Sequence, residues 1–156
     1  MVLCMALAAA VLTSCRNDSR VAVCQYANIS NGAWDRPDRI TFPVDSISTN
    51  GNYRLTISLR TTNEVQFQTF YLTAEQHFTH PEHHSTDTVA VALTDETGKI
   101  QGKGLGLYNY SVALATTTPL RQGQSGEITV GHIMRRNQLA GIINVGIKLT
   151  HEDSSY

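Results

Sequence analysis

The stretch Tyr53-Arg54-Leu55-Thr56-Ile57-Ser58-Leu59-Arg60 decides the fold class. Apolar and polar residues alternate along it, which is the period of a β-strand with one buried and one exposed face. In an α-helix the same alternation would scatter the apolar side chains around the axis. We therefore predict a half-buried strand at residues 53–60.

Segments on both sides of this strand have similar patterns, and turn-forming residues separate them. Asn50-Gly51 is a strong tight-turn signal, because both residues tolerate positive φ angles. No stretch predicts a long amphipathic helix; residues 133–139 could form one or two helical turns. The other predicted strands are residues 20–29, 39–44, 64–72, 88–93, 105–114, 126–134 and 142–150.

About seven to eight short strands in a chain of 156 residues predict an all-β, single-domain antiparallel β-sandwich. A closed barrel is the competing architecture. The sequence contains no internal repeat, no low-complexity linker and no sign of a second domain.

The N-terminus has the pattern of a bacterial lipoprotein signal. Residues 2–11 are apolar, and Leu12-Thr13-Ser14-Cys15 follows directly. The run is shorter than the roughly 20 apolar residues that span a bilayer, but it suits a removable signal peptide. A buried helix is the alternative, although the segment is apolar on every face. No basic residue precedes the run, so we interpret the signal as N-terminally truncated.

This pattern divides the chain into a signal peptide at 1–14, a lipidated Cys15 with a short tether at 15–20, a sandwich domain at 21–151 and a polar tail at 152–156. After cleavage, Cys24 is the only cysteine left besides Cys15. It cannot form a disulfide within the domain, and we predict that it packs as a small apolar residue in a strand. A lipid on Cys15 predicts a membrane-anchored protein of the cell envelope, at the outer membrane rather than the inner one.

The charge of the chain argues against nucleic-acid binding. Twelve basic and 13 acidic residues give a formal net charge of −1 and are spread evenly. A nucleic-acid-binding domain usually carries a clustered basic surface. We therefore expect the membrane and other envelope proteins, rather than nucleic acid, as partners.

The segment His77-Phe78-Thr79-His80-Pro81-Glu82-His83-His84 holds four of the six histidines. Imidazole is a good ligand for zinc, copper and nickel, so His77, His80, His83 and His84 are candidate metal ligands. A metal site also needs converging side chains with fixed support. Because Pro81 marks this segment as an irregular polar loop, we predict no bound metal and no other cofactor.

No catalytic motif stands out elsewhere. Residues 102–106 lack the Ser or Thr of a phosphate-binding loop, and a Gly-x-Ser-x-Gly elbow is absent from the sequence. Trp34 could stack on a sugar or plug one end of the core. The carboxylates that could pair for glycoside cleavage are scattered, and nothing selects a pair among them: Asp35, Asp38, Asp87, Asp95 and Glu127. We expect a protein that is not an enzyme.

Several stretches occur with the order and spacing of one known family. They are residues 53–60, Asp87-Thr88-Val89 before Leu93-Thr94-Asp95 and Gly98, residues 102–106, Pro119-Leu120, Met134-Arg135 and, most specifically, Leu139-Ala140-Gly141-Ile142-Ile143-Asn144-Val145-Gly146-Ile147-Lys148-Leu149. On these residues the chain resembles the GldH family of gliding-motility lipoproteins from Bacteroidetes. Residues 65–72 depart from the family, which usually has an aromatic-Pro-aromatic stretch and an Asn-Leu pair there. The histidine-rich segment is not a family feature either.

The resemblance implies an envelope lipoprotein linked to gliding machinery and its associated secretion, without an assigned enzymatic activity. We therefore expect a structural or accessory protein that contacts other envelope proteins. The alternative is a glycan-binding or glycan-processing module. The first function predicts an exposed apolar patch, and the second predicts a groove with aromatic residues and paired carboxylates.

Overall fold

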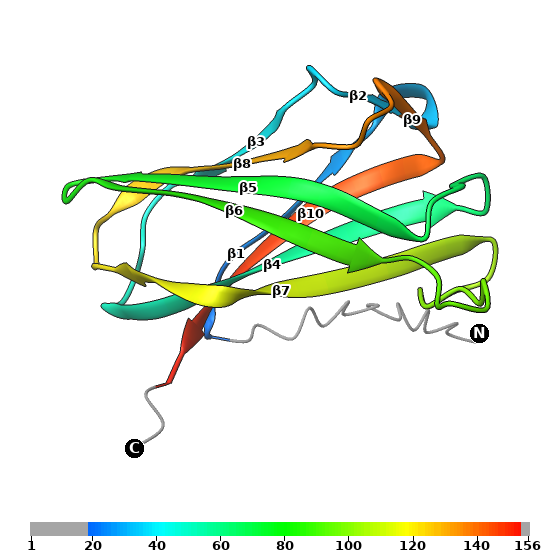
Figure 1. Ribbon diagram of the computed structural model, residues 1–156. Helices are drawn as coiled ribbons and strands as arrows, with labels where there is room; N and C mark the ends of the chain where they lie inside the picture. The colour runs from blue at the N-terminus through cyan, green and yellow to red at the C-terminus, as the bar shows by residue number, and fades with distance from the viewer. Residues whose placement is uncertain (1–18, 154–156) are drawn as a thin grey trace, which may run out of the picture.

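Two four-stranded antiparallel sheets face one another in the computed structural model, which describes residues 19–153 (Figure 1). The predicted signal peptide and Cys15 lie outside the described residues. The first sheet has the order β1 (Val21–Asn28), β10 (Ile142–Glu152), β4 (Gly51–Thr62) and β7 (Leu107–Leu120). The second has the order β3 (Ile40–Val44), β8 (Ser125–His132), β5 (Thr69–Thr79) and β6 (His83–Ala92).

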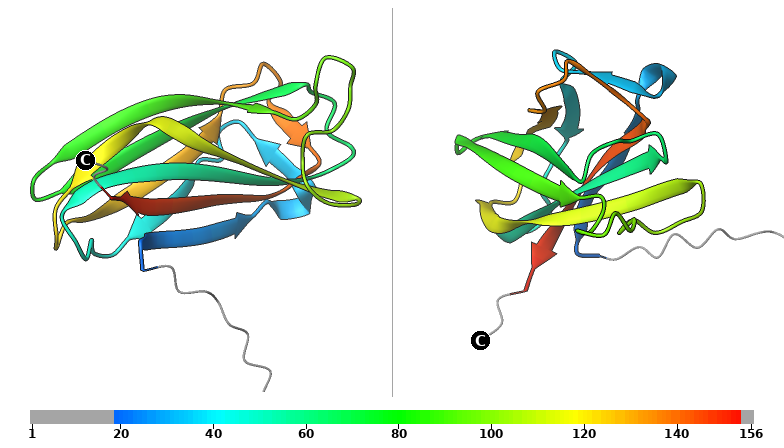
Figure 2. Two further views of the ribbon diagram at one scale, coloured as in Figure 1. Left: turned by 90° about the horizontal axis from the view of Figure 1, so that it is seen from below. Right: turned by 45° about the vertical axis from the view of Figure 1, so that its right-hand side comes forward.

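The predicted antiparallel sandwich is confirmed, and the sheets do not close into a barrel. Figure 2 shows the sandwich from below and after a 45° turn about the vertical axis. The structure adds two short strands, β2 (Ala33–Asp35) and β9 (Gln138–Ala140), which pair with each other at one end of the sandwich. A three-residue 3₁₀ turn, η1 (Ser30–Gly32), precedes β2.

Strand β4 has the burial pattern that its sequence predicts. Its apolar residues from Tyr53 to Leu59 are each at most 2% exposed, and the polar residues between them face outward. The neighbouring β10 contributes Val145, Ile147 and Leu149 to the same core, each at most 1% exposed. Apolar side chains from both sheets meet these residues in one buried cluster, which holds the layers together.

The ends of β10 and β4 are joined by an ion pair. Arg54 donates to both carboxylate oxygens of Glu152, with 3.0 Å between Nη2 and Oε2. This hydrogen bond lowers the pKa of the Glu152 carboxyl group. Strand β10 extends to Glu152, which is one residue past the domain boundary that we placed at 151.

The predicted strand at 64–72 is wrong in position, because β5 spans Thr69–Thr79. Val65 and Phe67 alternate with polar residues, yet they lie in the loop before β5 and pack against the core. The Arg136 guanidinium lies over the Phe67 ring, 5.8 Å from its centroid. This loop therefore covers the core with a strand-like sequence.

The second half of β5 was not predicted, because a polar residue occupies one of its inward positions. Gln76 is 2% exposed, and its Oε1 accepts a hydrogen bond from Thr118 Oγ1 at 3.1 Å. This bond satisfies a polar group that would otherwise be costly to bury. It also joins β5 of one sheet to β7 of the other.

Two further predictions are corrected by the structure. Residues 133–139 form no helical turn: the last two begin β9, and the carbonyls of Met134 and Arg135 accept hydrogen bonds from the Arg36 guanidinium. Cys24 lies in strand β1 as predicted but is exposed rather than packed. Its register explains this: Cys24 is paired with Lys148, which faces outward from β10.

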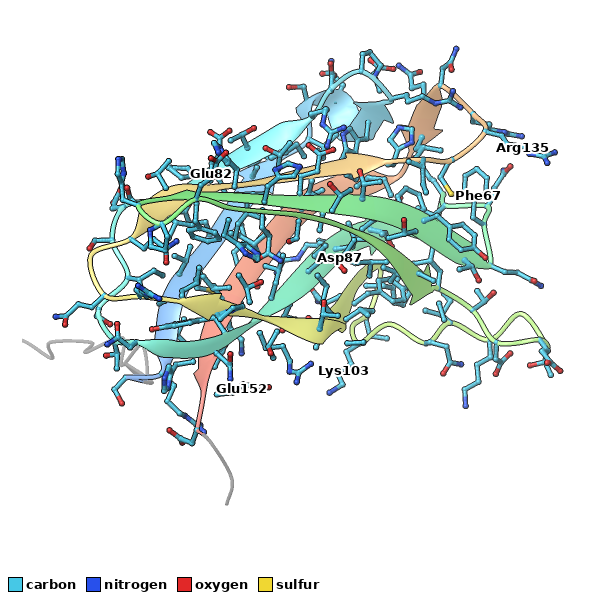
Figure 3. The ribbon with its side chains drawn as sticks, turned by 60° about the vertical axis from the view of Figure 1, so that its left-hand side comes forward. Phe67, Glu82, Asp87, Lys103, Arg135 and Glu152 are labelled. Atoms are coloured by element: carbon cyan, nitrogen blue, oxygen red, sulfur yellow. The ribbon has the colours of Figure 1, made fainter. Side chains whose placement is uncertain are left out.

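The two ends of the sandwich carry different turns and loops. The near end is where the chain enters at Ser19 and leaves at Asp153; it also carries the β5–β6 and β7–β8 turns. The far end carries η1, β2, β9 and the loops at 63–68, 93–106 and 133–137 (Figure 1). Figure 3 shows this separation, with Glu82 at the near end and Phe67 and Arg135 at the far end.

Candidate functional site

The loop at 93–106, between β6 and β7, is held in shape by one carboxylate. Asp95 Oδ1 accepts hydrogen bonds from Thr97 Oγ1 at 2.7 Å, Thr97 N at 2.9 Å and Lys99 N at 3.0 Å. Its Oδ2 accepts from Gln101 Nε2 at 3.2 Å. These bonds, led by the one from the Thr97 hydroxyl, lower the pKa of Asp95. The loop therefore has a defined conformation although it is exposed.

This loop holds Leu105 away from the protein. Leu105 is 97% exposed and lies between Gly104 and Gly106, whose φ angles are +137° and +75°. A Cβ on Gly104 would lie 2.0 Å from the Leu107 carbonyl oxygen, so only glycine fits there. The backbone thus turns sharply on both sides of Leu105 and leaves its side chain in solvent.

Large exposed apolar side chains gather at the far end. Leu107, which is 44% exposed, and Ile100, which is 36% exposed, flank Leu105 on the same segment. We call these three residues the Leu105 patch. Among residues 19–153, the other large apolar side chains that are exposed are Tyr71 and Ile133 at the far end, and Tyr26 on the outer face of the first sheet. Exposed apolar surface concentrated at one end is typical of a protein-binding site.

A shallow groove lies beside the Leu105 patch, between the edges of the two sheets. It has a volume of about 450 Å³ and is lined by Ala90 and Ala92 of β6 and by Asn109 and Ser111 of β7. Lys103 of the loop also lines it. Strands β6 and β7 are edge strands of their sheets, and a groove between two edges suits contact with a partner polypeptide.

The histidine-rich segment is a β-hairpin rather than the polar loop we predicted. His77 in β5 and His84 in β6 are cross-strand partners, and their ring centroids are 6.1 Å apart. His80 lies in the turn and His83 at the start of β6. Within residues 19–153, no three His, Cys, Asp or Glu side chains are grouped so that they could hold a metal ion.

Trp34 is buried as a plug at the far end and offers no ring face to a sugar. It is 1% exposed and packs against Phe70 and His132, with centroid distances of 6.4 and 5.3 Å. Its indole Nε1 donates to the Asp38 carbonyl at 2.7 Å. The plug interpretation of this residue is confirmed.

The five candidate carboxylates do not converge on one site. Asp35 and Asp38 line a hollow of about 280 Å³ beside Trp34, and Asp35 accepts a hydrogen bond from Gln138 at 3.0 Å. Asp87 instead accepts from Thr116, Asp95 shapes its own loop, and Glu127 pairs with His77 across β8 and β5. The hollow beside Trp34 thus brings two carboxylates together. Its indole ring is buried, so it cannot stack on a sugar bound there.

Leu105 is not among the residues that the sequence predicts as functional. The signal was present, because a leucine between two glycines is followed at once by a strand. The glycines of this segment have different roles, since Gly102 allows close packing: a Cβ there would lie 2.6 Å from Tyr110 Cζ. Within residues 19–153, no helix has the length and apolar character needed to span a bilayer.

Comparisons with known proteins agree with the resemblance found in the sequence. A family model described as GldH lipoprotein matches residues 22–149, nearly the whole sandwich from β1 to β10. No curated protein matches the sequence. Among solved structures, Eiger TNF from S. frugiperda is similar with a TM-score of 0.39 and 10% sequence identity, over 88% of this chain and 99% of that chain.

Proposed function

Because this chain belongs to the GldH lipoprotein family, we propose that it is a non-enzymatic accessory protein, anchored in the cell envelope by a lipid on Cys15, which binds other envelope proteins. A single observation carries the binding part of this proposal. Leu105 is 97% exposed on a loop that Asp95 holds in a fixed shape. An ordered loop that holds a leucine in solvent offers a partner a preformed apolar contact, because little further ordering is needed when the leucine is covered.

The positions of Cys15 and Leu105 support this arrangement. Cys15 precedes Ser19 by four residues, which span at most about 14 Å when fully extended. A lipid on Cys15 would therefore keep the near end close to the bilayer. Strand β4 has 12 residues, and a strand of that length is about 40 Å long. The Leu105 patch lies at the other end of this strand, where a partner could reach it.

Burial of Leu105 would contribute substantially to binding. Covering a fully exposed leucine is worth roughly 1.5–3 kcal/mol, which corresponds to a factor of about ten or more in affinity. We therefore expect Leu105→Ser to weaken capture of the partner from native envelopes at least about tenfold. The measurement is quantitative affinity capture with tagged protein, with the recovered envelope proteins identified by mass spectrometry.

The matched control for this experiment is Tyr26→Ser. Tyr26 is 66% exposed but lies on the outer face of the first sheet, away from the Leu105 patch. Capture should be unchanged in this variant. Recovery of a defined glycan but no envelope protein would favour the alternative glycan-binding function, and equal capture by wild type and Leu105→Ser would exclude the patch as the contact.

A further inference from the structure

Strand β1 is an edge of the first sheet, because within residues 19–153 only β10 pairs with it (Figure 2). Just after β1, Ile29 N donates to the Ile143 carbonyl of β10 at 2.9 Å. This bond fixes the phase of the antiparallel ladder, so the odd-numbered residues 23–29 bond to β10 and the even-numbered ones point the other way. The N–H and C=O groups on this free edge are those of Cys24, Tyr26 and Asn28.

The other three edge strands each carry a feature that hinders pairing with a further strand. Strand β3 contains Pro43, whose nitrogen has no hydrogen to donate. On β7, Asn109 exchanges backbone hydrogen bonds of 2.9 and 3.0 Å with Lys103 of its own loop. On β6, the charged Asp87 accepts a hydrogen bond from Thr116 of β7 at 3.3 Å. Strand β1, with the sequence Val-Ala-Val-Cys-Gln-Tyr-Ala-Asn, has neither a proline nor a charge, so the usual protection of an edge is missing.

The side chains of β1 also suit the addition of a strand. Tyr26 is 66% exposed, but its ring lies over Gly146 of β10, where a Cβ would be 2.3 Å from Tyr26 Cδ1. The ring therefore leans away from the free edge. On the inner face, Val23 and Ala27 pack against the core but are only half-buried. A further strand beside β1 would cover them and extend the core.

We propose that an extended segment of another envelope protein binds as an additional strand beside β1. Its backbone would pair with Cys24, Tyr26 and Asn28, and apolar residues at alternate positions would cover Val23 and Ala27. A row of free N–H and C=O groups selects an extended backbone, because the backbone groups of a helix are already bonded to one another. This inference rests on the proposed function, since it gives the envelope partner a second contact beside the Leu105 patch.

A second copy of this chain fits the free edge poorly when both copies are anchored in one bilayer. Two-fold pairing of two β1 strands in one sheet is antiparallel, so the near ends of the two copies would point in opposite directions. With one far end directed away from the bilayer, the other near end would lie roughly a strand length from it, about 26 Å for the 8 residues of β1. The four residues from Cys15 to Ser19 reach at most about 14 Å.

The test compares hydrogen exchange of the full chain in washed native envelopes with exchange of the same chain purified in non-ionic detergent. In detergent, the amides of residues 24, 26 and 28 should exchange fast, and those of residues 23, 25 and 27, which bond to β10, should exchange slowly. In envelopes, exchange at residues 24, 26 and 28 should slow at least about tenfold. Equally fast exchange in both preparations would overturn the proposal. Slow exchange in detergent that depends on protein concentration would identify a second copy as the occupant and would also overturn it.

Cys24→Pro removes one N–H group of the free edge without removing a bond to β10. We expect it to weaken capture of the envelope partner about tenfold, the effect of losing a hydrogen bond. Cys24→Ala keeps the N–H group and should bind as the wild type does. Ala113→Pro is the matched control, since Ala113 is exposed on β7 at the opposite edge of the same sheet and its N–H group also points away from the neighbouring strand.

The variants also separate this inference from the proposed function. Loss of capture in Leu105→Ser with wild-type capture by Cys24→Pro would overturn strand addition and leave the Leu105 patch as the contact. Equal losses in Cys24→Pro and Ala113→Pro would overturn strand addition as well. The exchange comparison uses the wild-type chain, so it decides the question even if a proline variant fails to fold.

Discussion

Replacing Cys15 with alanine is expected to abolish lipid labelling and to release the protein from the membrane fraction. No residue other than the cysteine of Leu12-Thr13-Ser14-Cys15 offers the acceptor that lipoprotein processing needs. The effect should be nearly complete, since burial of acyl chains contributes about 0.8 kcal/mol per CH₂ group and two or three chains hold a protein firmly. The measurements are incorporation of a labelled fatty acid and fractionation of washed envelopes, in which we expect the wild type in the outer membrane.

The chain offers a matched control for this experiment. Cys24→Ala removes the other cysteine of the predicted mature protein, which is exposed in β1 and makes no disulfide. Lipid labelling and membrane association should both persist in that variant. Unchanged membrane association of Cys15→Ala would contradict the anchor.

Trp34→Ala is expected to cause the largest loss of stability among single substitutions outside the signal segment. Trp34 is 1% exposed and fills the space between Phe70 and His132 at the far end. Truncation of a buried tryptophan to alanine costs about 3–5 kcal/mol through lost burial and the cavity left behind. Because Trp34 is the only tryptophan, unfolding in denaturant should be followed by circular dichroism rather than by fluorescence.

Trp34→Phe separates packing from hydrogen bonding at this position. Phenylalanine keeps most of the buried ring but loses the indole Nε1 bond to the Asp38 carbonyl, which is 2.7 Å long in the wild type. An unpaired carbonyl costs roughly 1–3 kcal/mol, so this variant should lie between the wild type and Trp34→Ala. A loss below about 1 kcal/mol in Trp34→Ala would show that Trp34 does not hold the far end together.

The strands with strict alternation were predictable, because their apolar and polar residues follow the same period of two as their buried and exposed positions. In β4 every second residue from Tyr53 to Leu59 enters the core, and the period of two is seen without knowledge of the partners. The antiparallel sandwich followed from several such strands and the short turns between them. The lipoprotein family was likewise predictable, since its most specific stretch runs from the end of β9 into β10.

Features that depend on contacts distant in the sequence were not predictable. The inward position of Gln76 is tolerated only because Thr118 meets it from the other sheet. Phe67 looks like a strand residue, but it covers the core from a loop under Arg136. Cys24 faces outward because its pairing with β10 fixes the orientation of β1, and a register of this kind is a property of two strands together.

In the candidate site, too, local features were predictable from the sequence and features that depend on distant contacts were not. The sequence Asp95-x-Thr97-Gly98 indicates a tight turn, and the structure shows that the Asp95 carboxylate organises it. The exposure of Leu105 was not predictable, because it depends on where β6 and β7 end relative to the two sheets. The contact between the Arg36 guanidinium and the Arg135 carbonyl at the far end joins residues that are 99 apart in sequence and meet only in the folded protein.

Site-specific photo-crosslinking at position 105 in native envelopes tests most directly whether the far end is the binding surface. A crosslinking side chain at Leu105 should give a defined adduct with an envelope protein, while one at His84, exposed on β6 at the near end, should not. An adduct that forms from position 105 and is absent from position 84 is the predicted result. No adduct from position 105, or the same adducts from both positions, would contradict the account.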